Sequence, residues 1–362
     1  MYKVAIISCG MIANAAHIPA YKHLPDHFEI VGVCDINEKA AKETAERHHI
    51  KNFYTNAEEM LKKLKPDIVS VCVPNCFHKE YVMLALSHNA HVLCEKPVAF
   101  QYKDAMEMYS FAQEKGKYLI GCQSMRFTPD RLAVKKMIEN GELDEIYYAE
   151  FSRIRRRGIP TWGTFHMKKI SCGGAFIDIG VHIVDALVWL MGNPKIRSVS
   201  ATTFQNHATE IGNLVESGAL TGEVHHVRTF HPEEMDVGDF ACGSMTFENG
   251  ARANFKVAWA TNLPEEASIK LISKKAGVDI PAGKIYKGKD TVEELKTEEN
   301  KYKEEAFFGH FYLVDNLLKV LKGEEDLIVK PEEIINVAAI LECFYKSAEL
   351  GREIHVKELE AK

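Results

Sequence analysis

The sequence predicts an α/β protein built from a doubly wound parallel sheet followed by an α+β domain with a large open, mostly antiparallel sheet. Over residues 1–122, short apolar runs alternate with helical segments, which is typical of a parallel sheet covered by helices. After Gln123 this alternation gives way to longer strand-like runs. The length of 362 residues exceeds what one hydrophobic core usually holds. We therefore expect two domains, 1–122 and 123–362.

The composition argues against a nucleic-acid-binding, a membrane-spanning or a disulfide-linked protein. Hydrophobic content of 46% and charged content of 27% are those of an ordinary globular protein, and a net charge of -6 argues against nucleic-acid binding. No run of 18 apolar residues is present, so we expect no membrane span. The nine cysteines form no C-x-x-C pair, which favours reduced thiols in a cytoplasmic protein.

The first half of the chain reads as regular alternation of strands and helices. Apolar runs of four to eight residues indicate buried strands, and the polar-apolar periodicity between them indicates helices. Strands are expected at 2–8, 28–35, 67–73, 91–94 and 118–122, and helices at 11–23, 37–48, 56–64, 77–87 and 101–115.

The first strand, turn, helix and second strand match the unit that binds dinucleotides. Its G-x-G-x-x-G/A fingerprint falls on Ser8, Gly10 and Ala13, with serine in place of the first glycine, so Ser8 requires a backbone compatible with a tight turn. Met11 and Ile12 begin the helix, whose free N–H groups suit a pyrophosphate. Asp35 follows the second strand and is placed to accept hydrogen bonds from a ribose 2′-hydroxyl, which favours NAD over NADP. The unit predicts a Rossmann domain.

A charged pair and a proline, Glu95-Lys96-Pro97, end the strand at 91–94. Ligands of open α/β sheets bind beyond the carboxyl ends of the strands, and an ammonium there can stabilise negative charge on a reacting oxygen. Pro97 restricts the backbone of Lys96 and so aims its side chain. The alternative is a surface lysine in an ordinary turn.

The second half is expected to be a sheet with helices on one face. Glu248-Asn249-Gly250 predicts a hairpin turn, and 205–235 looks like an excursion from the sheet. Strands are expected at 145–154, 196–204, 240–247, 251–259 and 268–273, helices at 129–140, 178–191, 305–322 and 331–351, and hairpins and loop at 274–300.

The helix at 178–191 carries a second candidate site. Asp178 and His182 are four residues apart and share a helix face, so the carboxylate can orient an imidazole that takes a proton at neutral pH. The alternative is a helix cap at Asp178 and a structural histidine; Asp185 is expected to be structural. His225, His226 and His231 lack a diagnostic spacing, and we expect no metal site.

Several motifs along nearly the whole chain resemble the Gfo/Idh/MocA family of nicotinamide-dependent oxidoreductases. The matching pieces are specific only in combination. They are the Gly10 turn, Pro74-Asn75 with His78, Glu95-Lys96-Pro97, Gly173-Gly174, Asp178-x-x-x-His182 and Ser347-Ala348-Glu349-x-Gly351-Arg352.

The resemblance implies an architecture and a mechanism. His182 would be the general base on a substrate hydroxyl, Lys96 would hydrogen-bond the reacting oxygen, and Asp178 would position the substrate and tune His182. Asn75, His78 and Glu95 would lie beside the nicotinamide half of NAD. The second sheet would form a homodimer or homotetramer interface, and the Lys96–Pro97 peptide would be cis.

The substrate expected from the resemblance is a sugar, a glycoside or a cyclic polyol. The stretch from Arg155 to Gly163 resembles sugar-oxidising branches, since a tryptophan face and arginine forks suit a polyhydroxylated ring. We expect Arg126 and Trp162 on the substrate side; ordinary loop packing is the alternative. A dinucleotide-binding sensor without turnover and an NAD-assisted glycosidase are the competing functions, but a sensor has no need of the proton relay that Lys96 and His182 offer.

Overall fold

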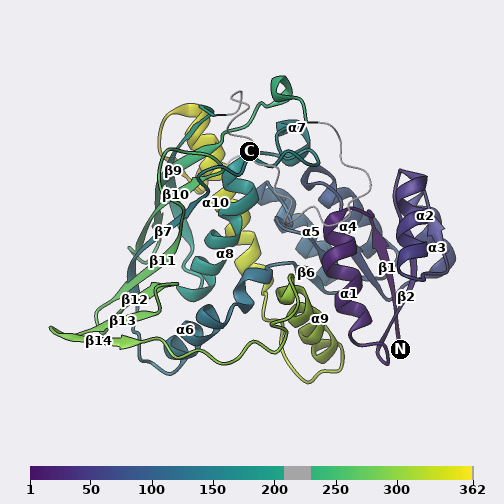
Figure 1. Cartoon of the computed structure of the whole chain (residues 1–362), viewed down its shortest axis with the longest axis horizontal. Coiled ribbons are helices and arrows are strands. Elements are labelled where there is room, and N and C mark those ends of the chain that lie inside the picture. The colour runs from purple at the N-terminus through teal and green to yellow at the C-terminus, as the bar shows by residue number, and fades with distance from the viewer. Residues whose placement is uncertain (208–229, 361–362) are drawn as a thin grey trace.

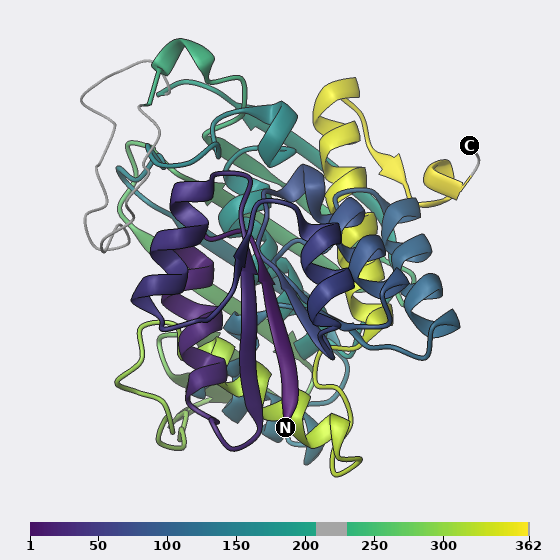
Figure 2. The same ribbon diagram turned by 90° about the vertical axis from the view of Figure 1, so that its right-hand side faces the viewer.

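The computed structural model describes residues 1–207 and 230–360. His225 and His226 lie outside these residues, as does most of the predicted 205–235 excursion. The chain forms two sheets with helices packed between and around them (Figures 1 and 2). The predicted α/β class is confirmed.

The amino-terminal sheet is parallel throughout, as the alternation predicted. The strands at 2–7, 68–71 and 91–94 are mostly buried because their apolar runs face helices on both sides. Asn37 caps the second helix by accepting hydrogen bonds from Lys39 and Ala40. In spatial order the strands are β3 (Phe53–Tyr54), β2 (Phe28–Cys34), β1 (Tyr2–Ile7), β4 (Ile68–Val71), β5 (His91–Cys94) and β6 (Leu119–Gly121). The helices are α1 (Ile18–Lys22), α2 (Glu38–Arg47), α3 (Ala57–Leu64), α4 (His78–Ser87) and α5 (Tyr102–Glu114).

The second sheet is mixed and mostly antiparallel. Among the strand pairs that the described residues form in this second sheet, only β10–β7 is parallel. In spatial order its strands are β14 (Thr291–Glu294), β13 (Lys284–Lys287), β12 (Gly277–Ile280), β11 (Glu266–Ser273), β7 (Ile146–Ile154), β10 (Arg252–Ala258), β9 (Phe240–Phe247), β8 (Ile196–Phe204) and β15 (Ile354–His355). The remaining helices are α6 (Pro129–Glu139), α7 (Lys168–Ser171), α8 (Val181–Leu190), α9 (Phe308–Leu321), α10 (Pro331–Leu350) and α11 (Lys357–Glu360).

Helices α8 and α10 lie between the sheets (Figure 1). Figure 1 shows α8 and α10 side by side in this layer, and α10 contacts both β8 of the second sheet and α5 of the first. The last part of the chain also returns to the first domain, because α9 packs on α1 and contributes Phe311 and Leu317 to the core of the parallel sheet. Packing therefore crosses the 122/123 limit, and the two-domain division stays a prediction.

The helices that carry the candidate site residues differ from regular α-helices. The segment predicted at 11–23 contains a π-helical stretch, Ala13–His17, before α1, and the segment predicted at 178–191 begins as a π-helix, Phe176–Gly180, before α8. A π-helix adds a residue to each turn and is found often at functional sites. Within the described residues the helical stretch Lys168–Leu190 is long and apolar enough to span a membrane, but 89% of its most apolar window is buried inside the protein.

The region predicted as hairpins and loop, 274–300, forms β12, β13 and β14. Two short edge strands, β3 and β15, were not predicted, because two-residue strands have no periodicity to detect. The Lys96–Pro97 peptide is cis, as the resemblance implied.

Candidate active site

The turn after β1 has the shape that a dinucleotide requires. Ser8 has φ +78°, a left-handed conformation that normally favours glycine, so the serine adopts the turn of the usual first glycine. A Cβ added to Gly10 would meet nothing closer than Ser8 Oγ, at 3.9 Å. Neither strain nor packing within the chain therefore demands glycine at position 10. The open space beside it suits close approach of a ligand to the backbone.

Asp35 links this turn to the end of β2. One carboxylate oxygen accepts a hydrogen bond from Cys9 N at 2.8 Å, and the other accepts one from Asn37 N at 2.9 Å. Asp35 lines a cavity of about 1060 Å³ together with Ser8, Gly10 and Met11. The carboxylate thus lies where the fingerprint placed it, and these residues fit the adenosine and pyrophosphate parts of NAD.

A second cavity, of about 850 Å³, adjoins the first. Ser8, Gly10, Met11 and Pro74 line both cavities, and Ile12 lines the second. The second cavity also receives all three predicted catalytic side chains, Lys96, Asp178 and His182. The two sheets thus bring residues 82 positions apart in the chain into one space beside the glycine turn.

Lys96 and Asp178 are bound to each other. Lys96 Nζ donates to the backbone oxygen of Asp178 at 2.8 Å and to its Oδ1 at 3.2 Å. The other carboxylate oxygen, Oδ2, accepts a hydrogen bond from Trp259 Nε1 at 3.0 Å. Asp178 therefore holds the ammonium in the cavity, while Trp259 holds Asp178.

His182 is ready to accept a proton. Burial, followed by the positive charge of Lys96, holds the pKa of His182 well below its usual value, so the ring is neutral at neutral pH. Within the described residues its buried Nδ1 has no hydrogen-bond partner. The predicted contact with Asp178 is corrected here: Lys96 and Trp259 occupy that carboxylate instead.

Asn75 and His78 support the cavity wall that they line. Asn75 Nδ2 donates to Ser171 O at 2.7 Å, which ties the end of β4 to α7. The ring nitrogens of His78 lie 2.7 Å from Pro97 O and 2.9 Å from Val73 O. His78 thus holds the turn of the Lys96 strand in place rather than offering a free donor to a ligand.

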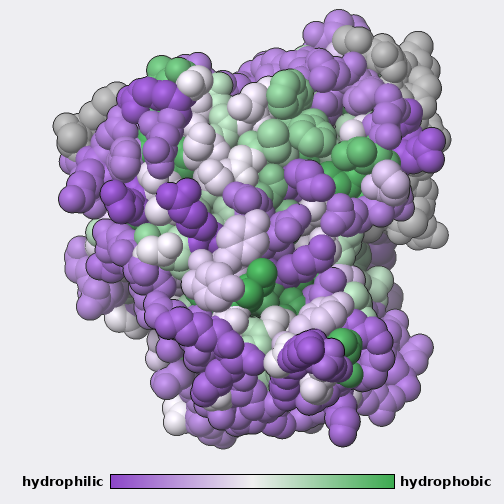
Figure 3. Space-filling view, turned by 90° about the vertical axis from the view of Figure 1, so that its left-hand side faces the viewer, coloured by the Kyte–Doolittle hydropathy of each residue, from purple (hydrophilic) through white to green (hydrophobic). Residues whose placement is uncertain are grey.

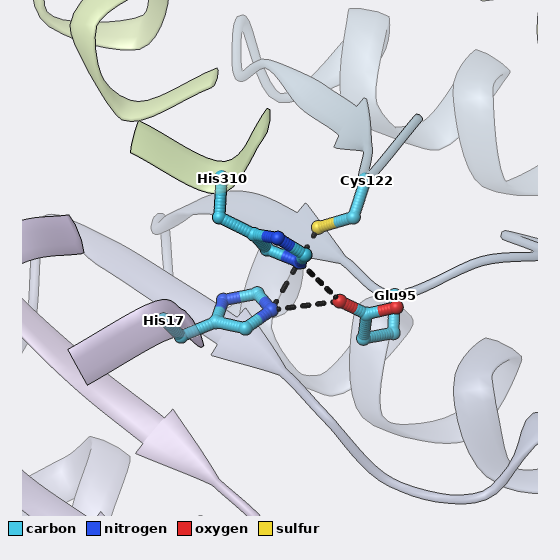
Figure 4. A group of neighbouring side chains, drawn as sticks. All are labelled: His17, Glu95, Cys122 and His310. Atoms are coloured by element: carbon cyan, nitrogen blue, oxygen red, sulfur yellow. Dashed lines mark hydrogen bonds and ion pairs between the residues drawn. The ribbon is translucent and has the colours of Figure 1, made fainter. Parts of the chain in front are cut away.

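Glu95 belongs to a buried cluster with His17, Cys122 and His310 (Figure 4). Its Oε1 lies 3.0 Å from His17 Nε2 and 2.8 Å from His310 Nε2. Burial acts to raise the pKa of Glu95, but the hydrogen bonds from the two rings hold it well below its usual value. Glu95 lines the second cavity, yet its carboxylate points toward the two histidines and not toward a ligand.

The donor atoms of this cluster all lie within 4.8 Å of one another, a spacing at which they could hold a metal ion. An ionised carboxylate only accepts hydrogen bonds, so both ring nitrogens donate to it and the carboxylate is satisfied without an ion. Cys122 Sγ lies 3.8 Å from His17 Nε2. The cluster joins the helix after β1, the ends of β5 and β6, and α9.

The prediction for Arg126 is wrong. Its side chain is fully buried, and its guanidinium forms an ion pair with Asp185 at 2.6 Å and a second one with Glu333. It lines neither cavity, so it is a structural ion pair between helices, and Asp185 is structural as expected. Trp162 does line the second cavity, as predicted for a substrate-side residue, and its ring meets that of Phe165 edge-on.

Sequence reasoning missed Trp259, Arg131, His17 and His310. Trp259 closes a predicted strand, but nothing in its surroundings indicates a hydrogen bond to a residue 81 positions earlier. Arg131 lies in an ordinary amphipathic helix and lines the second cavity. The two histidines are isolated in sequence, and only the fold brings them to Glu95.

Two family models match the chain. Residues 2–121 match an oxidoreductase family with an NAD-binding Rossmann fold, and residues 132–279 match the GFO/IDH/MocA C-terminal domain. The chain is 32% identical to the D-glucoside 3-dehydrogenase of Escherichia coli (strain K12), with 98% of this chain and 97% of that protein aligned.

Solved structures share the whole fold. The NAD-binding protein from Listeria innocua is 25% identical, with a TM-score of 0.76 over 99% of this chain and 98% of that one. The WlbA dehydrogenase from Bordetella pertussis, solved with NADH and UDP-GlcNAcA, is 23% identical, with a TM-score of 0.76 over 98% of both chains. With both domain models matched and a 32% identical relative aligned end to end, the chain belongs to the Gfo/Idh/MocA family of NAD-binding oxidoreductases.

Proposed function

We propose that this protein oxidises a secondary alcohol of a sugar, a glycoside or a cyclic polyol with NAD. One observation carries the proposal: Lys96 and a neutral, partly buried His182 line one cavity, which adjoins the glycine turn of the dinucleotide-binding unit. An ammonium and an unprotonated imidazole are the groups that alcohol oxidation needs beside a hydride acceptor.

The residues divide the work as follows. His182 takes the proton of the substrate hydroxyl, and Lys96 donates a hydrogen bond to the same oxygen as negative charge develops on it. Asp178 holds Lys96 by two hydrogen bonds and so fixes the ammonium. When bound, NAD supplies the nicotinamide that accepts the hydride from the alcohol carbon. Trp162 offers an apolar face for a sugar ring.

NAD is proposed as the preferred cofactor. Asp35 stands at the edge of the first cavity, where a carboxylate accepts hydrogen bonds from a ribose 2′-hydroxyl and repels a 2′-phosphate. Ser8, Gly10, Met11 and Ile12 line the second cavity beside the glycine turn, and they would hold the pyrophosphate of a bound NAD. Parallel titrations with NAD and NADP test the preference, and tighter binding of NADP would contradict it.

The substrate class is supported by a relative as well as by the cavity. The Escherichia coli relative is a D-glucoside 3-dehydrogenase. The sensor alternative is not favoured, because a sensor has no need of an ammonium and a neutral histidine beside the cofactor cavity. An NAD-assisted glycosidase would use the same two groups in its transient oxidation step, so the products formed distinguish it from a dehydrogenase.

A turnover screen tests the proposal. Purified protein is offered NAD with a panel of glucosides, free sugars and inositols, and NADH formation is followed by absorbance. We expect NADH with at least one member of the panel. Binding of NAD with no turnover on any member would support a sensor, and release of free sugar without net NADH would support a glycosidase.

We also propose that the protein is a cytoplasmic homodimer or homotetramer. Among the described residues, no helix covers the outer face of the second sheet, and pale and green side chains gather over its central and upper part within a purple border (Figures 1 and 3). Tyr147 on β7 is half exposed. All nine cysteines are free thiols, which suits a reducing compartment. Sedimentation equilibrium tests the assembly, and a monomer at micromolar concentration would contradict it.

A further inference from the structure

Three arginines line the second cavity, and none of them is paired with a carboxylate among the residues that the structure describes. Arg131 lies in α6, while Arg153 lies in β7 and Arg155 directly follows that strand. In the described part of the chain none of the three forms an ion pair. Arg131 is 7% exposed; its Nη1 donates to Met125 O at 2.6 Å, and its buried Nε has no hydrogen-bond partner among the described residues.

Arg126 shows how this protein treats a buried arginine that has a structural role. Burial acts to lower the pKa of Arg126, but Asp185 and Glu333 raise it above its usual value. The pKa of Arg131 and that of Arg153 are both lowered, chiefly by burial, although a guanidinium remains charged at any physiological pH. The chain binds the arginine in its core with two carboxylates, whereas Asp130 and Asp185 act on Arg131, and Glu265 on Arg153, without forming an ion pair among the described residues.

The acidic side chains of the same cavity are already engaged. Glu95 is bound to His17 and His310, and Asp178 is bound to Lys96 and Trp259. Asp130 accepts a hydrogen bond from the backbone N–H of Arg131 at 2.8 Å, and of the negative charges that raise the pKa of Arg131 it has the largest effect, followed by Asp185. Arg131 is buried, whereas Arg153 and Arg155 are partly exposed. A buried cation with no bound carboxylate is costly, so Arg131 above all favours an anion from outside the chain.

We propose that Arg131 and Arg153, with Arg155 beside them, form a subsite for an anionic group of the sugar substrate, a carboxylate or a phosphate. A guanidinium fork matches both groups by paired hydrogen bonds. The proposal rests on the proposed oxidoreductase function and narrows its substrate class to acidic sugars and sugar phosphates.

The subsite lies on the side of the cavity that holds His182. Positive charge from Arg131 and Arg153 acts on that ring, together with the charge of Lys96. A substrate anchored there by its anionic group has its ring hydroxyls within the part of the cavity that Lys96, His182 and Trp162 also line. Binding of the anionic group by the arginines therefore sets the orientation of the sugar in the cavity.

The test compares three substrates that share the same ring hydroxyls: methyl β-D-glucoside, methyl β-D-glucuronide and α-D-glucose 1-phosphate. We expect kcat/KM of the wild-type enzyme to be at least about tenfold higher for a charged substrate than for the glucoside, since a hydrogen bond to a charged group is worth that much. Comparison of kcat/KM for the glucuronide and for glucose 1-phosphate shows whether the subsite binds a carboxylate or a phosphate. Arg153→Gln is expected to remove the preference, and Arg153→Lys to keep part of it.

Arg157→Gln is the matched control. Arg157 follows the same strand but lines neither cavity; it donates to Thr261 O at 2.8 Å, so its loss should leave the preference unchanged. The anion subsite would be overturned if the wild-type enzyme oxidised the neutral glucoside as fast as, or faster than, the charged sugars, and if Arg153→Gln left these rates unchanged. The oxidoreductase proposal would remain intact.

A binding measurement keeps the two proposals separable. If none of the three sugars is oxidised, the proposed function is in doubt, and the subsite is tested by tryptophan fluorescence, because Trp162 lines the same cavity. In the presence of NADH we expect glucuronate or glucose 1-phosphate to bind at least about tenfold more tightly than glucose in wild type, but not in Arg153→Gln. Equal affinities for charged and neutral sugars would reject the subsite.

Discussion

Lys96 and Trp259 bind opposite oxygens of one carboxylate, that of Asp178, at 3.2 and 3.0 Å. Trp259 is fully buried and lies at the end of β10, whereas Lys96 follows β5 of the other sheet. The position of the ammonium therefore depends on both sheets. This relation assigns Asp178 a positioning role toward Lys96.

Trp259→Phe should lower kcat while leaving KM and NAD affinity near their wild-type values. Phenylalanine keeps most of the buried bulk but removes the N–H that fixes Asp178, so Lys96 loses its alignment and kcat should fall about tenfold. Steady-state kinetics with the best substrate measure the effect. Trp189→Phe, in α8, removes an indole of similar burial away from Asp178 and serves as control. Equal effects of the two variants would argue against a specific role for the Trp259 N–H.

The acid limb of the pH profile should lie below the ordinary histidine range. His182 must be unprotonated to accept the hydroxyl proton, and its folded pKa is lowered by burial first and by Lys96 second. The rate of oxidation should thus persist as pH falls below about 6.5 and be lost only when pH reaches the lowered pKa. In Lys96→Met the His182 pKa should rise, because a positive charge is removed.

Two measurements check these shifts. The pH dependence of kcat/KM reports the acid limb of the free enzyme, and NMR titration of the imidazole signals reports the pKa of His182 in Lys96→Met. His182→Asn identifies the signal by its loss. A His182 pKa that stays the same or falls in Lys96→Met would show that the two groups do not share a site.

Gly10→Ala should weaken NAD binding without reducing stability. The added methyl group meets nothing closer than 3.9 Å within the protein, so folding should be unaffected, but it fills the space through which a pyrophosphate approaches the backbone. We expect Kd for NAD to rise at least about tenfold, measured by calorimetric titration, with an unchanged Tm. If the Kd for NAD in Gly10→Ala equalled that of the wild type, the pyrophosphate would not bind at this turn.

Asp185→Asn should destabilise the protein strongly. It leaves the fully buried guanidinium of Arg126 with Glu333 as its remaining carboxylate, and breaking a buried ion pair costs about 3–5 kcal/mol. The free energy of unfolding, from denaturant titration, measures the loss. Glu58→Gln breaks an exposed pair with Lys62 and should cost no more than about 1 kcal/mol. Similar costs for both variants would contradict the structural role of Arg126.

Local patterns were sufficient to predict most of the fold, whereas the family resemblance supplied the expectation that Lys96, Asp178 and His182 share one site. Apolar runs that alternate with helical segments located the parallel strands. Pro97 after Lys96, and Gly10 after the first strand, marked the strand ends where ligands bind. Lys96, Asp178 and His182 do line one cavity, as the resemblance implied. The strands and the glycine turn depend on residues near one another in sequence, but this convergence does not.

The parts that were missed depend on contacts between distant segments. Arg126 carries no local sign that Asp185 and Glu333 will bury it, and Arg131, five residues later, carries none that it will face the cavity. The direct Asp178–His182 contact failed because Lys96, 82 positions earlier, takes the carboxylate. Helix periodicity places a side chain on a face, but tertiary packing decides which partner reaches it.

The most direct test of the account is the turnover of Lys96→Ala with NAD and the best substrate of the panel, measured beside its Kd for NAD. We predict that NADH formation falls by at least about a thousandfold, as when the group that stabilises the reacting oxygen is removed, while the Kd for NAD changes little. Undiminished turnover in Lys96→Ala would contradict the assignment of the cavity as the place where the alcohol is oxidised.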